Sequence, residues 1–319
     1  MIGISHIDFW DVGQADSSVI HLTDGSYILI DVGTRKSPVV GWLTSFASAH
    51  VRVALITHND GDHIGGLTSL VSSKTVEIDE VLYVPFRDSN SAKVENLYAA
   101  LSRIRDRLRP AIEGDIAWNS GLWSISILQP NTLDAWGGIG GINRCSAIYE
   151  LNYNGVPWVI WPGDTAVSNL KEKLGSKKPY LIVGPHHGNP PDSKEPDFGK
   201  NVTAISQERS FLSLGSRRAQ QGKKLPRPNS YFVKQLTKKG CKVTCSQLTS
   251  NCSETAFDEW DCILDGTQIL GLHGSSKGFS CRGTLRLHWD ATGELFRPDR
   301  NEVVHRQRIA ERLPQALCR

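Results

Sequence analysis

The stretch LITHNDGDHIGG, residues 55–66, decides how this sequence is interpreted. Within six positions it places four side chains that can each bind a metal ion, namely His58, Asp60, Asp62 and His63. Buried ionised groups cost on the order of several kcal/mol unless they are paired or bound to a metal, so packing alone does not explain the cluster. The spacing therefore indicates a metal centre, and a solvated polar loop is the alternative.

Two later segments place further ligand types directly after strand-like runs. The run WPGDT supplies Asp164, and PYLIVGPHHG supplies His186 and His187. The first motif itself follows VRVALITH, a continuous apolar run typical of a buried strand. A single aspartate after a strand is as readily a helix N-cap. Three strand ends that each deliver ligands are more specific, and they predict a metal centre assembled from several loops.

Hydrophobic periodicity predicts strand groups separated by helices, twice along the chain. Strands are expected at residues 4–10, 17–22, 27–33, 51–58, 76–86, 122–130, 146–164 (a hairpin about Asn154-Gly155), 179–188, 210–215, 241–248 and 283–290. Helices are expected at residues 65–72, 92–108, 167–174, 230–239 and 302–317. This order favours two sheets packed face to face with helices outside.

The composition excludes few functions. The 319 residues are 39% hydrophobic and carry a formal net charge of +3, too small to indicate a nucleic-acid binder by bulk electrostatics. The start lacks the pattern of a secretory signal, and no long apolar run suits a membrane span. We expect a cytoplasmic protein without membrane partners, whose seven cysteines are reduced thiols or metal ligands.

The ordered motifs resemble the metallo-β-lactamase superfamily, and within it the ComEC-like branch of competence-protein metallohydrolases and their soluble stand-alone relatives. DVGQADSSVI, ILIDVG, THNDGDHIGG, NRCSAIYEL, GDT, HHGN and FLSLG follow in the order of that branch, over about residues 4–249. The resemblance implies an α/β (α+β) fold, the four-layer αββα sandwich. It implies a metallohydrolase domain at residues 1–250 and a Cys-containing C-terminal extension at residues 251–319 that ends in a helix.

The same resemblance implies roles for the ligands of two divalent metal ions. His58 and Asp60 would hold one ion, Asp62 and His63 the other, and Asp164 would bridge them. One of His186 and His187 would close the second site. The family's intermediate histidine is absent, because no histidine lies between His63 and His186.

The segment aligned with the missing histidine offers Asn143 and Ser146 instead. Oxygen donors in place of imidazole shift preference from Zn²⁺ toward Mn²⁺, so we favour Mn²⁺ and keep Zn²⁺ as the alternative. A site that retains a single metal ion is the main rival.

The implied reaction is hydrolysis of a phosphodiester by a water that two metal ions activate, and the favoured activity is that of a DNA nuclease. His58, Asp62 and His63 are the catalytic candidates, and the Asp62 carboxylate would orient or deprotonate the water. One alternative is hydrolysis of a small ester such as a cyclic nucleotide, phosphocholine or lactone. Another is a partner-binding module with a degenerate metal site. By analogy with the branch, a bacterial multi-component system, including phage defence, would supply a protein partner.

A basic segment at residues 215–242 contains no acidic residue and follows a strand whose family counterpart borders the active site. It would bind a phosphate backbone, with DNA favoured, or it is a solvated surface. The substrate-binding candidates are Asn143, Ser146, Arg217, Arg218, Lys223, Lys224 and Arg227. Relatives carry His-Pro where this chain has Arg227-Pro228, so any role of that loop histidine is in doubt here.

Four cysteines near the C-terminus, Cys241, Cys245, Cys252 and Cys281, would suffice for a structural zinc site. Their spacing lacks the close C-x₂-C pair of common zinc folds, and buried strand thiols are the favoured account.

Overall fold

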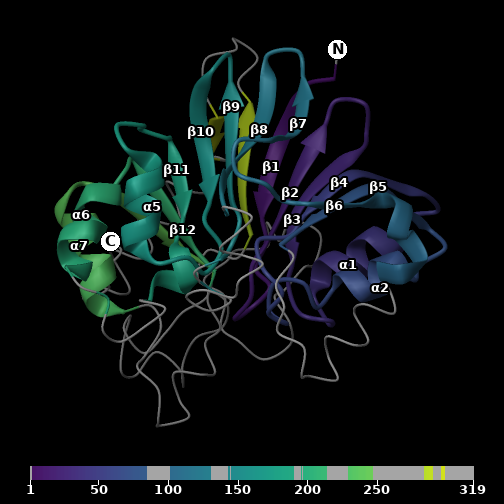
Figure 1. Cartoon of the computed structure of the whole chain (residues 1–319), viewed down its shortest axis with the longest axis horizontal. Coiled ribbons are helices and arrows are strands. Elements are labelled where there is room, and N and C mark those ends of the chain that lie inside the picture. Colours follow the sequence, from purple (N-terminus) through teal and green to yellow (C-terminus); the bar gives the residue numbers. More distant parts are fainter. Residues whose placement is uncertain are drawn as a thin grey trace, which may run out of the picture.

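Two β-sheets lie face to face, and helices cover their outer sides (Figure 1). The structure is a computed structural model that describes residues 2–84, 101–130, 143, 145–189, 195, 197–213, 229–246, 284–289 and 296–298. The four-layer αββα sandwich expected from the sequence is confirmed.

The first sheet has eight strands in the order β15-β14-β1-β2-β3-β4-β5-β6. Its strands are β1 (Ile4–Phe9), β2 (Ser17–Leu22), β3 (Tyr27–Val32), β4 (Ala49–Leu55), β5 (Val76–Tyr83), β6 (Leu108–Pro110), β14 (Leu285–Trp289) and β15 (Phe296–Pro298). The β3, β4 and β5 strands are parallel. The loops that follow these strands therefore emerge at one edge of the sheet.

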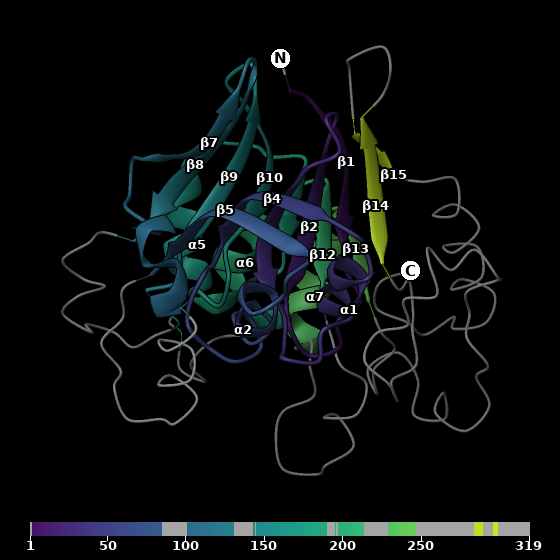
Figure 2. The ribbon, with the colours of Figure 1, turned by 90° about the vertical axis from the view of Figure 1, so that its right-hand side faces the viewer.

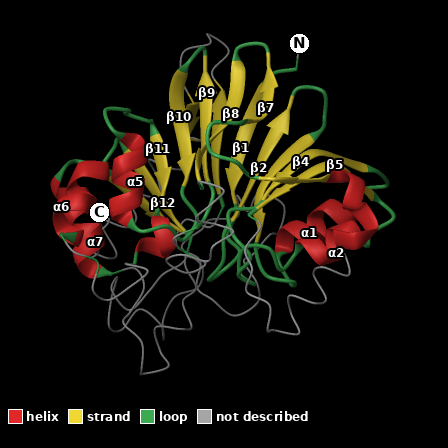
Figure 3. Cartoon of the chain, in the orientation of Figure 1, coloured by secondary structure: helices red, strands yellow, loops and turns green. Residues whose placement is uncertain are grey.

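The second sheet has seven strands in the order β13-β12-β11-β10-β9-β8-β7. They are β7 (Ile116–Ser120), β8 (Trp123–Gln129), β9 (Ile148–Tyr153), β10 (Val156–Trp161), β11 (Leu181–Val183), β12 (Arg209–Leu212) and β13 (Lys242–Cys245). The β10, β11, β12 and β13 strands are parallel, so their C-terminal ends also share an edge. In Figure 3 the loops of both sheets gather at the lower edge of the sandwich.

Three hydrophobic clusters hold the layers together. The first, which includes Phe9 and Tyr149, fills the space between the sheets. The second lies beneath α1 (Pro38–Thr44) and α2 (Leu67–Val71), and the third beneath α5 (Val167–Leu174), α6 (Phe198–Ile205) and α7 (Ser230–Lys238). Because successive side chains of a strand point to opposite faces, apolar residues of the strands pack on both faces of each sheet.

The expected elements agree with the structure in most places. The hairpin turns at Asn154-Gly155, where both residues have positive φ. The helix expected at residues 92–108 differs: residues 102–107 form the 3₁₀ helix η1 (Ser102–Arg107), and residues 85–100 lie outside the described part. Ile104 interrupts η1 with non-helical dihedral angles, and the chain becomes extended at Leu108. The expected C-terminal helix at residues 302–317 also lies outside the described part.

The β14 strand lies in the stretch assigned above to the C-terminal extension, yet it pairs antiparallel with β1. The boundary at residue 250 stays a prediction. Cys241 and Cys245 are buried in the third hydrophobic cluster, whereas Cys252 and Cys281 lie outside the described residues.

None of the helices in the described part has the length and apolar character needed to cross a membrane.

Candidate metal centre

The loop after β4 carries the first four expected ligands and is held by backbone hydrogen bonds. The amide of Val32 at the end of β3 donates to the carbonyl of His63 at 2.7 Å, and the amide of Asp16 donates to the carbonyl of Asp62 at 3.1 Å. Within the loop, the amide of His63 donates to the carbonyl of Asp60 at 2.9 Å. Because the neighbouring strand and the β1–β2 loop fix this backbone, its side chains are held over the sheet edge.

Asp164 follows β10 and lies at the centre of the site. Its loop approaches the β4 loop closely at Gly163, which has φ +55°; a Cβ there would lie 2.7 Å from the Cβ of Thr57. Only glycine fits this conformation and this contact. Asp164 itself is 3% exposed, so its carboxylate is enclosed by the surrounding loops.

One side of the Asp164 carboxylate faces His58, Asp60 and His186. His58 Nε2 lies 3.9 Å from Asp164 Oδ2 and 3.6 Å from Asp60 Oδ2. His186 Nε2 lies 3.4 Å from the same Asp164 oxygen. From the sequence, this side was left with one imidazole, and the structure places a second imidazole there.

The other side of the carboxylate faces His63, His187 and Asp62. His63 Nε2 lies 3.2 Å from Asp164 Oδ1, and His187 Nε2 lies 4.0 Å from it. Asp62 Oδ2 lies 3.7 Å from His187 Nε2. The four histidines therefore lie against the Asp164 carboxylate, and Asp60 and Asp62 each adjoin one of them.

The two neighbouring histidines, which approach different oxygens of Asp164, have an unusual backbone. His186 and His187 have φ values of 47° and 55°, in the left-handed region that non-glycine residues seldom adopt. They belong to the 3₁₀ turn η2 (Pro185–Gly188), and the amide of His186 donates to the carbonyl of Gly163 at 3.1 Å. Such strain persists where the surrounding structure imposes it, often at functional sites.

Hydrogen bonds at Nδ1 orient three of the imidazoles. His63 Nδ1 donates to Asp31 Oδ2 at 2.7 Å, and His187 Nδ1 donates to the carbonyl of Ser213 at 3.1 Å. Thr57 Oγ1 donates to Asp31 at 2.7 Å, so it accepts from His58 Nδ1 at 3.1 Å. In the neutral rings, each Nε2 then carries a lone pair that points toward Asp164. This is the arrangement by which outer carboxylates and carbonyls orient metal-binding histidines.

The atoms that point at the centre are those without hydrogen bonds. Within the part of the chain that the structure describes, Nε2 of His58, His63 and His187 and Oδ1 of Asp164 are buried and have no hydrogen-bond partner. Buried polar atoms are nearly always paired, and leaving one unpaired costs about 1–3 kcal/mol. Nitrogen lone pairs and carboxylate oxygens directed at one another are stabilised by cations between them, so the residues fit bound metal ions.

The pKa values of the ligands indicate an excess of negative charge at the metal centre. Burial alone would lower the pKa of His63, but the charges of Asp164 and Asp31 hold it well above its ordinary value. Burial also opposes protonation of His187, yet Asp16 raises that pKa from 6.5 to about 9. For Asp164, burial would raise the pKa, and the charges of His63 and His187 hold it well below its ordinary value. Without metal ions, protons on the imidazoles balance the carboxylates.

Metal affinity should therefore depend on pH. His187 must release its Nε2 proton to bind an ion, and its pKa of about 9 means that the proton competes at every lower pH. We expect the apparent affinity to rise roughly tenfold per pH unit for each displaced proton between pH 6 and 9. Competition against a fluorescent chelator between pH 6 and 9 measures this; an affinity independent of pH would contradict it.

Asp31 should contribute to metal binding without contacting the ions. Besides His63, its carboxylate accepts from the amide of Thr57 at 2.8 Å and from the Thr57 hydroxyl. We expect Asp31→Asn to lower metal affinity about 10–100-fold, because the His63 ring loses its charged partner. Chelator competition measures the effect. The exposed Asp79→Asn should bind like the wild type, and equal loss in both variants would indicate a general effect on folding.

Two of these carboxylates were not among the residues selected from the sequence. Asp31 is the penultimate residue of β3. Asp16 precedes β2 and lies 3.5 Å from His187 Nδ1 and 3.9 Å from His63 Nδ1. Four buried side chains, Asp16, His63, Asp164 and His187, come within 4.8 Å of one another. A signal was present, because both aspartates lie in the segments DVGQADSSVI and ILIDVG.

The remaining expected residues divide into two groups. Ser146 is fully buried beside Gly163, where a Cβ would lie 3.1 Å from its own Cβ, and the amide of Ser146 donates to the carbonyl of Asn143. The oxygens Ser146 Oγ and Asn143 Oδ1 have no hydrogen-bond partner among the described residues. Arg217, Arg218, Lys223, Lys224 and Arg227 lie outside the described residues.

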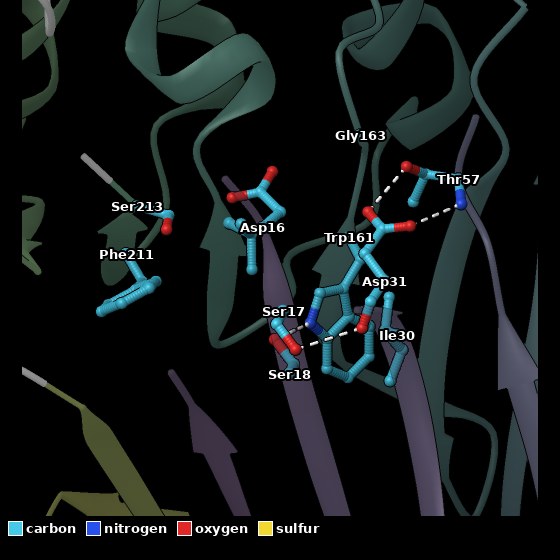
Figure 4. Close-up of a pocket in the computed structure, with 11 residues that line it drawn as sticks. Asp16, Ser17, Ser18, Ile30, Asp31, Thr57, Trp161, Gly163, Phe211 and Ser213 are labelled. Atoms are coloured by element: carbon cyan, nitrogen blue, oxygen red, sulfur yellow. Dashed lines mark hydrogen bonds between the residues drawn. The ribbon is translucent and has the colours of Figure 1, made fainter. Parts of the chain in front are cut away.

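A small cavity lies behind the centre, between the sheets (Figure 4). Its lining includes Asp16, Asp31, Thr57 and Trp161, and about 10 Å³ is open to the centre of a water molecule. This is room for roughly one water, so the cavity does not accommodate a substrate. A substrate must approach from outside the loops, where Asp60 and Asp62 are 45% and 30% exposed in their side chains.

Comparison with protein families gives one match. Residues 10–88, about a quarter of the chain, match the family described as the metallo-beta-lactamase superfamily. The match contains the ligand loop His58–His63 and Asp31, and it supports a relationship with this superfamily. No curated protein matches significantly.

Solved structures with a similar arrangement have low sequence identity. Igni18, a metallo hydrolase from the archaeon Ignicoccus hospitalis KIN4/I, is 14% identical, with a TM-score of 0.47 over 76% of this chain and 95% of that chain. The short form of human tRNase Z is 13% identical, with a TM-score of 0.42 over 67% of this chain and 94% of that chain.

Proposed function

We propose that this protein is a metal-dependent hydrolase of the ComEC-like branch that cleaves phosphodiester bonds, with DNA as the favoured substrate. The observation that carries the proposal is the set of buried Nε2 atoms of His58, His63 and His187, which point at the Asp164 carboxylate without hydrogen-bond partners in the described residues. A purely structural loop would pair such atoms, whereas a hydrolytic metal centre requires them unpaired.

We assign two divalent ions to the two sides of Asp164. His58, Asp60 and His186 would hold one ion, and Asp62, His63 and His187 the other, with Asp164 between them. Two bound divalent ions would lower the pKa of water and stabilise both the attacking and the leaving oxygen of a phosphodiester. Each side then offers imidazole and carboxylate donors, a mixed set that suits Mn²⁺ or Zn²⁺; the carboxylates favour Mn²⁺.

Asp62 has the geometry of a water-positioning residue. Its side chain is 30% exposed, while its neighbour His187 is fully buried, so Asp62 lies where the site opens to solvent. Burial would raise the pKa of Asp62, but the adjacent His187 and His63 hold it below its ordinary value. A carboxylate with a low pKa is a weak base, so we assign to Asp62 the orientation of the attacking water rather than removal of its proton.

The choice of DNA rests on the basic segment at residues 215–242. Ser213, two residues before this segment, accepts a hydrogen bond from His187 through its carbonyl. The residue two positions before the segment therefore contacts a histidine of the metal centre. Lysines and arginines at that position would bind the phosphates that flank the cleaved bond.

The test is hydrolysis by the purified protein of single-stranded DNA, double-stranded DNA and bis(p-nitrophenyl) phosphate with Mn²⁺, Mg²⁺ or Zn²⁺. We expect DNA cleavage that Asp62→Ala lowers by at least about 100-fold and that Asp79→Ala leaves unchanged. Hydrolysis of bis(p-nitrophenyl) phosphate without cleavage of DNA would contradict the nuclease assignment and support hydrolysis of a small ester. Equal inactivity of the wild type and Asp62→Ala on all substrates would refute the hydrolase and favour a partner-binding module.

A further inference from the structure

A second cluster of potential metal ligands lies on the first sheet, apart from the centre described above. His6 and Asp8 on β1 and His21 on β2 each offer one ligand atom, and these atoms lie within 4.8 Å of one another. In β1, Ile7 and Phe9 point into the core between the sheets. Because side chains alternate along a strand, His6 and Asp8 belong to the opposite, outer face.

Strand register brings the cluster together. His6 lies opposite His21 of β2 on one side and opposite His288 of β14 on the other. The rings of His6 and His21 stack with centroids 3.8 Å apart, and the centroids of His6 and His288 are 5.7 Å apart. Three imidazoles thus form a row across adjacent strands, and Figure 2 shows β14 beside β1 at this edge of the sheet.

The geometry around Asp8 suits a bound cation. His21 Nε2 lies 3.1 Å and His6 Nε2 lies 4.0 Å from the same oxygen, Asp8 Oδ2. Two metal–ligand bonds of about 2.0–2.2 Å each can span a separation of 4.0 Å. A direct hydrogen bond cannot span it, whereas an ion placed between His6 and Asp8 would join them.

His6 also has an unsatisfied ring nitrogen. Its Nδ1 lies 2.8 Å from Ser5 Oγ, whereas its Nε2 is shielded from solvent and has no hydrogen-bond partner among the described residues. Whichever tautomer the ring adopts, Nε2 is left as a buried donor or acceptor that costs about 1–3 kcal/mol. The side chains of His6 and His21 are 19% and 13% exposed, so an ion could enter from solvent.

We propose that His6, Asp8 and His21 form a separate binding site for a transition-metal ion such as Zn²⁺ or Cu²⁺. The ion replaces the proton that His21 Nε2 shares with Asp8, and the ring keeps its other proton on Nδ1. Two imidazoles and one carboxylate favour Zn²⁺ and Cu²⁺ over Mg²⁺ and Mn²⁺. The exposed His288, whose ring lies 5.7 Å from that of His6, or a water would supply a fourth ligand.

Neighbouring side chains hold these ligands in place. Arg286 of β14 donates to Asp8 Oδ1 at 2.6 Å and to Asp8 Oδ2 at 2.7 Å, and the His21 ring packs edge-on against Tyr27 with centroids 5.3 Å apart. A hydrogen-bonded carboxylate and a fixed imidazole are typical supports of metal ligands. Arg286 also opposes the charge of the ion, which is a further reason to expect only ions that bind nitrogen tightly.

A bound ion would stabilise the edge of the sheet. It would join β1 to β2 directly and, through the Asp8–Arg286 pair, would hold β14 against β1. The site shares no residue with the Asp164 centre, so metal binding at His6, Asp8 and His21 can be measured separately from hydrolysis at the Asp164 centre.

The experiment compares the number of bound Zn²⁺ ions in the wild type and in His6→Gln and His21→Gln after equilibration at a fixed free Zn²⁺ concentration. We expect each variant to bind one equivalent fewer than the wild type while metal-dependent hydrolysis is unchanged. His50→Gln is the matched control, because His50 is a histidine of the same sheet in an exposed pair with Asp79; it should bind as many ions as the wild type.

An independent measurement needs no variant. Crystals of the wild type soaked in Zn²⁺ should show an anomalous peak bounded by His6, Asp8 and His21. Equal numbers of bound ions in the wild type and both variants, or soaked crystals without a peak there, would overturn the proposal. If the variants fail to fold, the crystal measurement decides.

Discussion

Asp164→Ala is expected to release both metal ions and to lower kcat/KM for phosphodiester hydrolysis by at least about 10³-fold, or about 4 kcal/mol of transition-state stabilisation. The reason is the position of its two oxygens: Oδ1 faces His63 and His187, and Oδ2 faces His58 and His186. Among the described carboxylates, only that of Asp164 lies within 4.0 Å of Nε2 atoms on both sides. The measurements are metal content by mass spectrometry and initial rates on bis(p-nitrophenyl) phosphate.

The matched control for this variant is Asp79→Ala, which removes an exposed carboxylate from β5. It should retain both ions and the wild-type rate. If Asp164→Ala kept two tightly bound ions, the assignment of Asp164 between them would be wrong. If Asp164→Ala lost the ions and its circular-dichroism spectrum also showed loss of the fold, the measurement would be repeated with Asp164→Asn, which keeps the shape of the side chain.

The second large effect should separate the two neighbouring histidines. His187→Ala is expected to lose only the ion on the side of Asp62 and His63, and His186→Ala only the ion on the side of His58 and Asp60. Each loss should lower the hydrolysis rate about 10²–10³-fold, because the remaining ion stabilises only part of the transition-state charge. Metal content distinguishes one remaining ion from two.

Spectra of the Co²⁺-substituted variants provide a readout other than activity. The two variants should retain different halves of the wild-type absorption spectrum, since different ligand sets remain. The exposed His50→Ala serves as the control for loss of an imidazole. A His186→Ala variant that binds two ions and hydrolyses at the wild-type rate would remove His186 from the ligand set.

The sequence predicted the sandwich and the convergence of its strand ends for a physical reason. Continuous apolar runs such as residues 51–58 indicate buried parallel strands, and the ends of parallel strands meet at one edge. The ligand types that follow three such runs were therefore expected together, and the structure places Nε2 of His58, His63 and His187 within 4.0 Å of the Asp164 carboxylate.

Features that depend on strand order or backbone strain could not be predicted from the sequence. Asp31 supports His63 only because β3 lies beside β4, and neither residue reveals that order. His186 and His187, which approach different oxygens of Asp164, both adopt left-handed conformations, and residue type does not predict these outside glycine. The pairing of β14 with β1 joins distant parts of the chain, and no local signal specifies it.

The most direct test of the central claim is a crystal structure of the wild-type protein with Mn²⁺, with anomalous data collected at the manganese edge. The account predicts two peaks, one on each side of the Asp164 carboxylate, the first contacting His58 and His186 and the second contacting His63 and His187. A single peak, or manganese bound elsewhere while these Nε2 atoms contact no ion, would contradict it.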